Sequence, residues 1–116
     1  MIIDEKTNAI SMTRGDSEGF SVSYDDENGA IVPFEDGDTV ELTVRKRDTA
    51  PEKLMHKVVT EFEEDGTAYF TIEPKDTEGW RFGDYVYDIQ WTKRNGWRTT
   101  IIKTSPFTVT SEVSYD

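Results

Sequence analysis

Short turn signals recur along this chain and separate stretches in which apolar and polar residues alternate. The signals are rich in Gly, Asp and Asn, which tolerate the backbone conformations of tight turns. They are RGDSEG at 14–19, DDENG at 25–29, EDGD at 35–38, EEDG at 63–66 and RNG at 94–96. Short alternating stretches separated by such turns are typical of a sandwich or barrel. The chain is therefore predicted to be all-β.

The alternation has a period of two, which places every second side chain on the same face of a strand. In residues 39–47 the apolar residues Val40, Leu42 and Val44 share one face. Loop 63–66 is expected to join its two flanking strands as a hairpin. The predicted strands are 8–14, 18–25, 39–47, 53–63, 67–73, 84–94, 97–105 and 106–113, with a short additional strand within 30–34.

The segment DYVYDIQWTKRNGWRTTIIKT, residues 84–104, predicts a second hairpin. Asn95 and Gly96 fit a two-residue type I′ turn, and counting outward from that turn gives a register. A slip of one residue would turn Asp88 toward the core, so the pattern supports this register. The predicted core-side pairs are Trp91 with Thr100, Ile89 with Ile102 and Tyr87 with Thr104, and the outer pairs are Asp88 with Lys103 and Thr92 with Thr99.

Three local features refine the fold. GDYVY at 83–87 has the spacing of a tyrosine corner, in which Tyr85 would hydrogen-bond back to the preceding crossing segment. That segment, 73–80, is expected to hold one helical or 3₁₀ turn. Pro106 lacks an N–H and is expected at an edge or a strand switch. These features favour an immunoglobulin-like antiparallel β-sandwich of seven or eight strands, with residues 1–116 as a single domain.

Length and composition limit the classes of protein to consider. The 116 residues suffice for one core, and six Phe, five Tyr and three Trp are too many for a disordered acidic chain. There is no cysteine, so disulfides and thiolate metal sites are excluded. No signal-peptide pattern and no stretch of ~20 apolar residues is present, so we expect no membrane partner and a cytoplasmic location after synthesis.

The chain is strongly acidic. Its net charge is −11, from 24 acidic and 13 basic residues. A surface of this sign repels phosphate backbones, whose binding depends on Lys and Arg. Nucleic acid is therefore not an expected partner.

Residues for catalysis or metal binding are sparse. His56 is the one histidine, too few for a two-histidine metal site, and no glycine-rich phosphate loop is present. The acidic loops 25–27 and 35–38 could supply oxygen ligands to calcium, but neither has the EF-hand spacing, and solvated turns are favoured. We predict a protein that is not an enzyme and has no cofactor.

Exposed aromatic residues are the candidate interaction surface. The hairpin register puts Trp97 on the outer face next to Arg94, Trp80 lies in the crossing segment, and Tyr69 faces outward from its strand. Such residues could stack on sugars, or could anchor a protein interface, where Trp and Arg are enriched. The structural alternatives are that Trp97 packs over the stem of Arg94 and that Trp80 closes one end of the core.

Several segments carry a family resemblance. They are MTRGDS at 12–17, DGDTVELTVRK at 36–46, TIEPKDTEG at 71–79, GDYVYDIQ at 83–90 and FTVT at 107–110. Together they resemble immunoglobulin-like domains encoded by bacteriophages and prophages, among them the N-terminal domain of the phage baseplate upper protein. The resemblance implies a non-enzymatic structural protein of a virion tail or baseplate. Such a protein assembles with copies of itself or with other phage structural proteins, after a stay in the bacterial cytoplasm. The alternative function is a carbohydrate-binding module that uses Trp97, Trp80 and Tyr69.

The tetrapeptide formed by residues 14–17, Arg-Gly-Asp-Ser, is also an integrin-binding motif in animal matrix proteins. An adhesive role would require a protruding loop. Gly15 supplies backbone freedom, and Asp16 can hydrogen-bond the amides of a turn. The favoured interpretation is a turn between the first two predicted strands.

Overall fold

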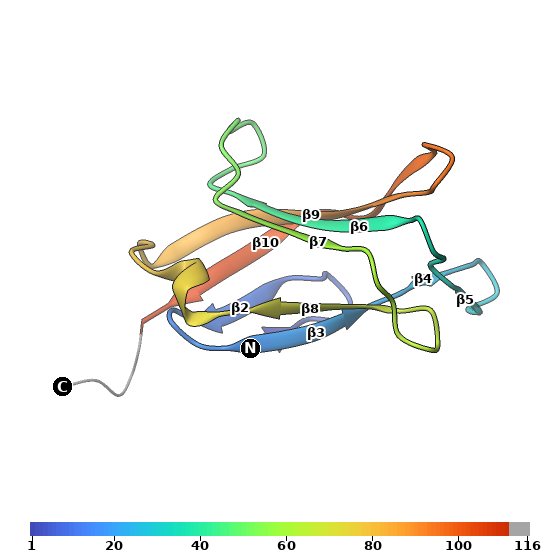
Figure 1. Ribbon diagram of the computed structural model, residues 1–116. Helices are drawn as coiled ribbons and strands as arrows, with labels where there is room; N and C mark the ends of the chain where they lie inside the picture. Colours follow the sequence, from blue (N-terminus) through green and yellow to red (C-terminus); the bar gives the residue numbers. More distant parts are fainter. Residues whose placement is uncertain (112–116) are drawn as a thin grey trace.

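The computed structural model describes residues 1–111, which form ten strands and one short 3₁₀ helix (Figure 1). The protein is all-β, as predicted, and no helix in this described part is long and apolar enough to cross a membrane. The elements are β1 (Ile2–Ile3), β2 (Ile10–Thr13), β3 (Glu18–Val22), β4 (Tyr24–Asp25), β5 (Ile31–Val32), β6 (Thr39–Arg45), β7 (Met55–Val59), β8 (Ala68–Ile72), η1 (Pro74–Thr77), β9 (Gly83–Thr92) and β10 (Arg98–Thr110).

The strands form one large curled sheet and two small ones. The large sheet has six strands in the order β1-β2-β10-β9-β6-β7, and the pairs β3-β8 and β4-β5 form the small sheets. Figure 1 shows β6, β7 and β9 in one layer and β3 and β8 in the layer below it. The end of β10 runs parallel to β2. The large sheet is therefore mixed, and the prediction of a purely antiparallel arrangement is wrong.

Strand boundaries differ from the predictions at several places. The predicted strand 18–25 is divided at Ser23, so that β3 pairs with β8 and β4 pairs with β5. The predicted strands 97–105 and 106–113 are one strand, β10, as far as Thr110, and positions 112 and 113 lie outside the described residues. Strand β1 was not predicted, because two residues are too short for an alternation pattern.

Loop 63–66 is a tight turn, but it does not connect hairpin partners. The Glu63 N–H donates to the Thr67 carbonyl over 3.0 Å, and the Gly66 N–H to the Glu63 carbonyl over 2.8 Å. Strand β7 nevertheless pairs with β6 and β8 pairs with β3. The predicted hairpin is wrong: this connection carries the chain from one layer to the other.

The β9–β10 hairpin is confirmed, with a different register. Of the predicted core-side pairs, Ile89 with Ile102 is observed. Register shifts lie on either side of Ile102, and such bulges displace each later pair by one residue. The structure pairs Thr92 with Arg98, Trp91 with Thr99 and Tyr87 with Ser105, and it contains no Asp88–Lys103 pair. Pro106 pairs with Val86 of β9, and β10 gains its second neighbour, β2, only from Phe107 onward. Among the described residues Pro106 therefore lies where the other side of β10 is an edge, which is one of the two predicted positions.

The core lies between the two layers and has an aromatic cluster near each end. The alternation predicted for 39–47 is confirmed, because Val40, Leu42 and Val44 are all fully buried. Burial of each such side chain contributes about 1.5 to 3 kcal/mol. At one end Trp91 contacts Phe34, with ring centroids 4.9 Å apart. At the other end Trp80 contacts Tyr85 at 4.7 Å and Phe107 at 6.3 Å.

The tyrosine corner and the 3₁₀ turn are both present. The Tyr85 hydroxyl donates to the Arg81 carbonyl over 2.7 Å, just after η1. The buried Tyr87 hydroxyl donates to the carbonyl of Asn8, and burial raises the pKa of Tyr87 to about 12. These two bonds tie β9 to the segments that precede β2 and β9.

Candidate functional site

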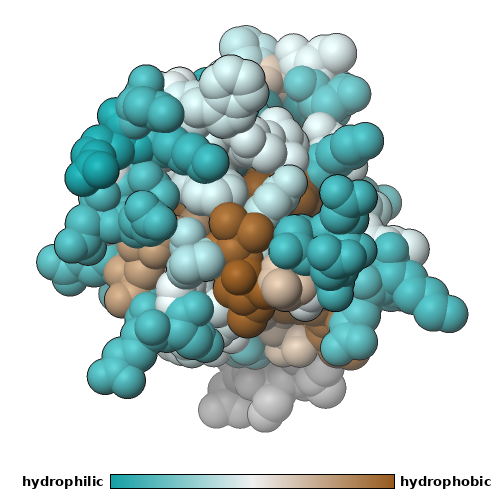
Figure 2. Space-filling model, turned by 90° about the vertical axis from the view of Figure 1, so that its right-hand side faces the viewer, coloured by the Kyte–Doolittle hydropathy of each residue, from teal (hydrophilic) through white to brown (hydrophobic). Residues whose placement is uncertain are grey.

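Four loops gather at one end of the molecule, which we call the hairpin end. They are residues 26–30, 33–38, 60–67 and 93–97, and they lie at the right of Figure 1. Figure 2 looks directly at this end and shows hydrophobic side chains in its centre, with hydrophilic side chains around them. An apolar centre within a polar rim is the usual anatomy of a protein interface.

The loop of the β9–β10 hairpin has three residues rather than two. The Lys93 N–H donates to the Trp97 carbonyl, and the Gly96 N–H donates to the Lys93 carbonyl, each over 2.8 Å. Gly96 has a positive φ of 92°, but Asn95 does not, because Asn8 is the one non-glycine residue with positive φ in the described part. A type I′ turn requires positive φ at both central residues, so the turn is not of that type. The loop is a type I turn followed by a left-handed glycine. This turn shifts the register by one residue and presents Trp97 at its end.

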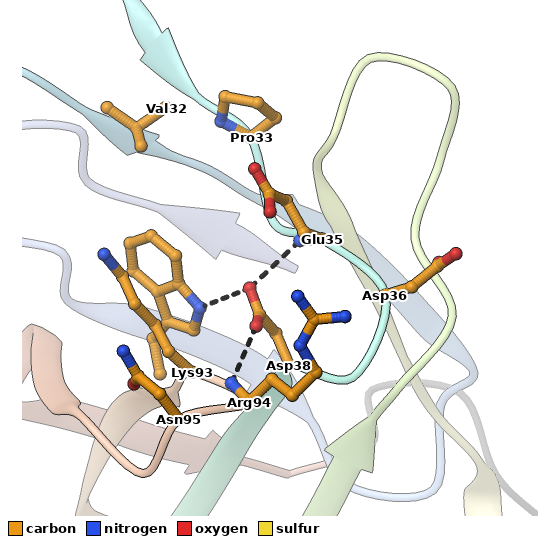
Figure 3. Close-up of a pocket in the computed structure, with 9 residues that line it drawn as sticks. Val32, Pro33, Glu35, Asp36, Asp38, Lys93, Arg94 and Asn95 are labelled. Atoms are coloured by element: carbon orange, nitrogen blue, oxygen red, sulfur yellow. Dashed lines mark hydrogen bonds between the residues drawn. The ribbon is translucent and has the colours of Figure 1, made fainter.

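Asp38 anchors this hairpin to the core (Figure 3). Its carboxylate is buried and accepts hydrogen bonds from the Trp91 indole over 3.1 Å, the Arg94 N–H over 3.0 Å and the Glu35 N–H over 3.0 Å. Burial by itself would raise the pKa of Asp38, but these bonds and the ammonium group of Lys93 outweigh it and lower the pKa. The ionised carboxylate therefore connects loop 33–38, strand β9 and the hairpin loop.

A pocket of about 190 Å³ lies beside Asp38. The stem of Arg94 lies over Gly37, since a Cβ built on that glycine would be 2.7 Å from Arg94 Cδ. The Lys93 ammonium lies 5.0 Å from the centre of the Trp91 ring, so both cations border the opening. The pocket is lined by Val32, Pro33, Glu35, Asp36, Asp38, Trp91, Lys93, Arg94 and Asn95.

Trp97 is the most exposed aromatic side chain of the hairpin end. It is 68% exposed, and its backbone N–H is held by Asn95 Oδ1 over 2.9 Å. The stem of Arg94 packs on Gly37. An anchored backbone with a free indole ring is a suitable arrangement for an interface hot spot.

The other two predicted surface residues lie elsewhere. Trp80 is half-buried against Tyr85 at the start of β9, so it closes the end of the core opposite the hairpin. The ten residues of β9, about 30 Å, separate it from Trp97. Tyr69 lies on the outer face of the β3-β8 sheet and covers Gly19, where an added Cβ would be 2.1 Å from the Tyr69 hydroxyl oxygen. The structure brings Trp97 and Arg94 together on one loop and places Trp80 and Tyr69 apart from them.

The Arg-Gly-Asp segment is a turn, as predicted. The Arg14 guanidinium lies 4.3 Å from the centre of the Phe82 ring and donates to the Trp80 carbonyl over 3.1 Å. The Gly15 N–H donates to the buried Thr77 hydroxyl over 2.9 Å. The arginine is thus held against the protein, which differs from a protruding adhesive loop.

The acidic loops are organised by their own hydrogen bonds. Asp26 Oδ1 accepts the N–H groups of Asn28 and Ala30, and Asp38 is engaged as described above. His56 lies on β7 with Nε2 3.8 Å from Glu41 Oε1. Within residues 1–111, no group of three or more His, Asp or Glu side chains is arranged to hold a metal ion.

The role of Asp38 was missed at the sequence level, where the residue was considered only as a turn or calcium ligand. A buried tryptophan needs a partner for its indole N–H, and Trp91 was predicted to be buried. That requirement is the signal that could have led to Asp38, although it does not say which carboxylate is the acceptor.

Comparison of the chain with models of known protein families, with curated proteins and with solved structures found no match.

Proposed function

We propose that the chain is a non-enzymatic assembly module of a bacteriophage or prophage particle, in its tail or baseplate, and that it works through protein–protein contacts. One observation supports the part of the proposal that concerns protein–protein contacts. The hairpin that Asp38 anchors presents Trp97, 68% exposed, beside Arg94 and a small pocket. Trp and Arg next to a pocket are the residue types that dominate binding energy at interfaces.

The order of the strands supports the immunoglobulin-like part of the proposal. In a variable-type immunoglobulin domain one sheet has the order G-F-C-C′, and strands B and E pair in the other. Strands β10-β9-β6-β7 and β3-β8 follow these two orders along the chain. Tyr85, near the start of β9, is in the position of the tyrosine corner. Because a fold does not determine a function, the phage assignment rests on the sequence resemblance described above.

The direct test is capture of a partner among the products of neighbouring genes. The purified chain is immobilised, and each neighbouring product is applied separately at physiological ionic strength. We expect retention of at least one tail or baseplate product, and about a thirty-fold loss of affinity for Trp97→Ala, because hot-spot truncations cost ~2 kcal/mol or more. Ile2→Ala is the matched control, since Ile2 is 74% exposed and lies on β1. If no neighbouring product is retained, the proposal fails.

A further inference from the structure

The C-terminal hairpin of this acidic protein carries four of the 13 basic residues, in a segment without acidic residues. Residues 89–111 contain no Asp or Glu and carry Lys93, Arg94, Arg98 and Lys103. The whole chain has a net charge of −11 and this segment contributes +4, so the remainder carries −15. The segment thus forms a positive hairpin on a negative protein.

These cations form no salt bridges among the described residues. Within residues 1–111, none of the four lies within ion-pair distance of a carboxylate. Lys93 lies over the Trp91 ring, and Arg98 Nε donates to the Thr92 hydroxyl over 3.3 Å. The charges of the hairpin therefore remain available to a partner.

Acidic loops lie at the same end of the molecule. Loop 33–38 contacts loop 60–67 and the hairpin loop 93–97. The Phe34 N–H donates to the Gly66 carbonyl over 2.9 Å, and Gly37 lies under the stem of Arg94. Figure 1 shows the β9–β10 hairpin above these loops at the right-hand end. The exposed acidic residues of this end are Asp25, Asp26, Glu27, Glu35, Asp36, Glu61, Glu63, Glu64 and Asp65.

Apolar side chains lie at the hairpin end as well. Ile31 is 47% exposed at the β4-β5 pair, and Val32 lines the pocket beside Asp38. Figure 2 shows hydrophobic surface in the centre of this end. The face thus has a positive side, a negative side and an apolar centre.

We propose that the hairpin end is the interface of a two-fold symmetric dimer with a second copy of the chain. A two-fold axis that lies in the interface and runs between the basic and the acidic side of this face places the basic hairpin of each copy against the acidic loops of the other. Trp97, at the end of each basic hairpin, is then covered by the loops of the other copy. The proposal rests on the proposed function, for which it names the contact surface and one partner.

The net charge opposes dimerisation at long range and is compatible with it at contact. Charges farther apart than ~8 Å are largely screened at physiological ionic strength, whereas contacting groups of opposite sign are not. Added salt weakens the overall repulsion between two copies and the attraction between contacting opposite charges at the same time, so a salt titration does not distinguish them. Substitutions of charged residues at defined positions distinguish the contact attraction from the overall repulsion.

The test measures self-association by sedimentation velocity over a range of concentrations. We expect a monomer–dimer equilibrium that Arg94→Gln with Arg98→Gln weakens at least ~10-fold and Trp97→Ser weakens ~30-fold. Arg47→Gln with Lys53→Gln changes the net charge equally in the β6–β7 connection and should have little effect. The Trp97 variant removes a side chain with no ring contact in residues 1–111, so it also serves if the arginine variant folds poorly.

The decisive variant removes acidic charge instead of basic charge. Neutralising three acidic loop residues, Glu27, Glu63 and Glu64, with glutamine lowers the overall repulsion, yet it should weaken the dimer because it removes the partners of the hairpin. Neutralising Glu5, Glu52 and Glu78, which are exposed outside the hairpin end, should leave the dimer unchanged or slightly stronger. If both triple variants strengthen self-association alike, the proposal is wrong.

Other outcomes distinguish the failure of this interface from the failure of the proposed function. A chain that stays monomeric but captures a neighbouring gene product through Trp97 overturns the second-copy interface and leaves the proposed function intact. A monomeric protein that retards a single-stranded oligonucleotide in a gel mobility-shift assay also overturns the second-copy interface, because the hairpin cations then bind nucleic acid. A dimer with the expected variant pattern and no captured product supports this interface while the proposed function fails.

Discussion

Replacing Asp38 with alanine should destabilise the protein much more than replacing either of the exposed acidic residues of the same loop, Glu35 and Asp36. The side chain accepts one hydrogen bond within the core, from Trp91, and two at its margin, from Glu35 and Arg94. Alanine removes the acceptor of all three hydrogen bonds. The indole N–H of Trp91 then loses its partner, although Trp91 is only 4% exposed to solvent. No other side chain links the hairpin loop to the loop before β6 by such bonds within residues 1–111.

The magnitude follows from the burial of each bond. A hydrogen bond to a charged group contributes ~1.5–3 kcal/mol when buried, and water can replace much of it at a margin. Counting about 2 kcal/mol for Trp91 and about 0.5 kcal/mol for each backbone N–H gives a loss of about 3 kcal/mol. For a chain of this size that loss corresponds to a fall in Tm of about 10 to 15 °C.

Urea denaturation followed by tryptophan fluorescence measures the loss. The matched control is Asp36→Ala, because Asp36 is exposed in the same loop and should change the free energy of unfolding by less than ~0.5 kcal/mol. A loss below ~1 kcal/mol for Asp38→Ala would refute the assignment of Asp38 as the anchor of the hairpin.

The pH dependence gives an independent check on the same residue. The pKa of Asp38 is lowered in the folded state, so its ionised form stabilises the protein above the unfolded value of ~3.9. That stability is lost as pH falls through the lowered folded pKa. The difference in unfolding free energy between the wild type and Asp38→Asn should therefore shrink between about pH 5 and pH 3. A difference that stays constant over this range would contradict the lowered pKa.

Three further predictions concern other parts of the structure. Tyr85→Phe removes the bond to the Arg81 carbonyl and should cost about 1 kcal/mol in urea denaturation, and no change would dismiss the tyrosine corner as a stabilising feature. Gly19→Ala should destabilise the protein by no more than about 1 kcal/mol, because its Cβ displaces only the outer end of the half-exposed Tyr69 ring, and pairing it with Tyr69→Ser should recover most of that loss. Trp97→Phe should remove most of the acrylamide-quenchable tryptophan emission, as the indole is 68% exposed in a monomer, and quenching that stays unchanged would place Trp97 in a covered site.

The inward-facing pattern could be read from the sequence because it is a local property. The alternation in β6, β8 and β9 identifies the buried residues of these strands, for example Leu42, Phe70 and Ile89. The tyrosine corner was predictable for the same reason, since Tyr85 and Arg81 are four residues apart.

Pairing between distant strands was less accessible. Strand β2 lies beside β10 although nearly a hundred residues separate them, and loop 63–66 has the sequence of a hairpin turn while it joins two layers. The Asn-Gly pair suggested type I′, but a three-residue loop is compatible with the same residues, and two bulges around Ile102 then set the register. Local turn chemistry does not distinguish these alternatives, because they depend on tertiary packing.

Two of the four residues predicted for the interaction surface lie together at the candidate site. The sequence indicated that Trp97 and Arg94 lie together, since they flank one turn, but it also grouped Trp80 and Tyr69 with them. Exposure is decided by tertiary neighbours, and Trp80 finds its neighbour in Tyr85. Asp38 was missed because two of its three donors, on Trp91 and Arg94, are 53 and 56 residues away in sequence.

The most direct test of the hairpin end as the contact surface is a ¹⁵N–¹H correlation spectrum recorded as the protein concentration is raised. The three indole signals can be assigned with Trp97→Phe and Trp80→Phe variants. We predict that the Trp97 indole and the amides of residues 93–98 shift with concentration, while the indole of Trp80 stays in place. Shifts confined to the β3-β8 face or to the η1 end of the molecule would contradict this account.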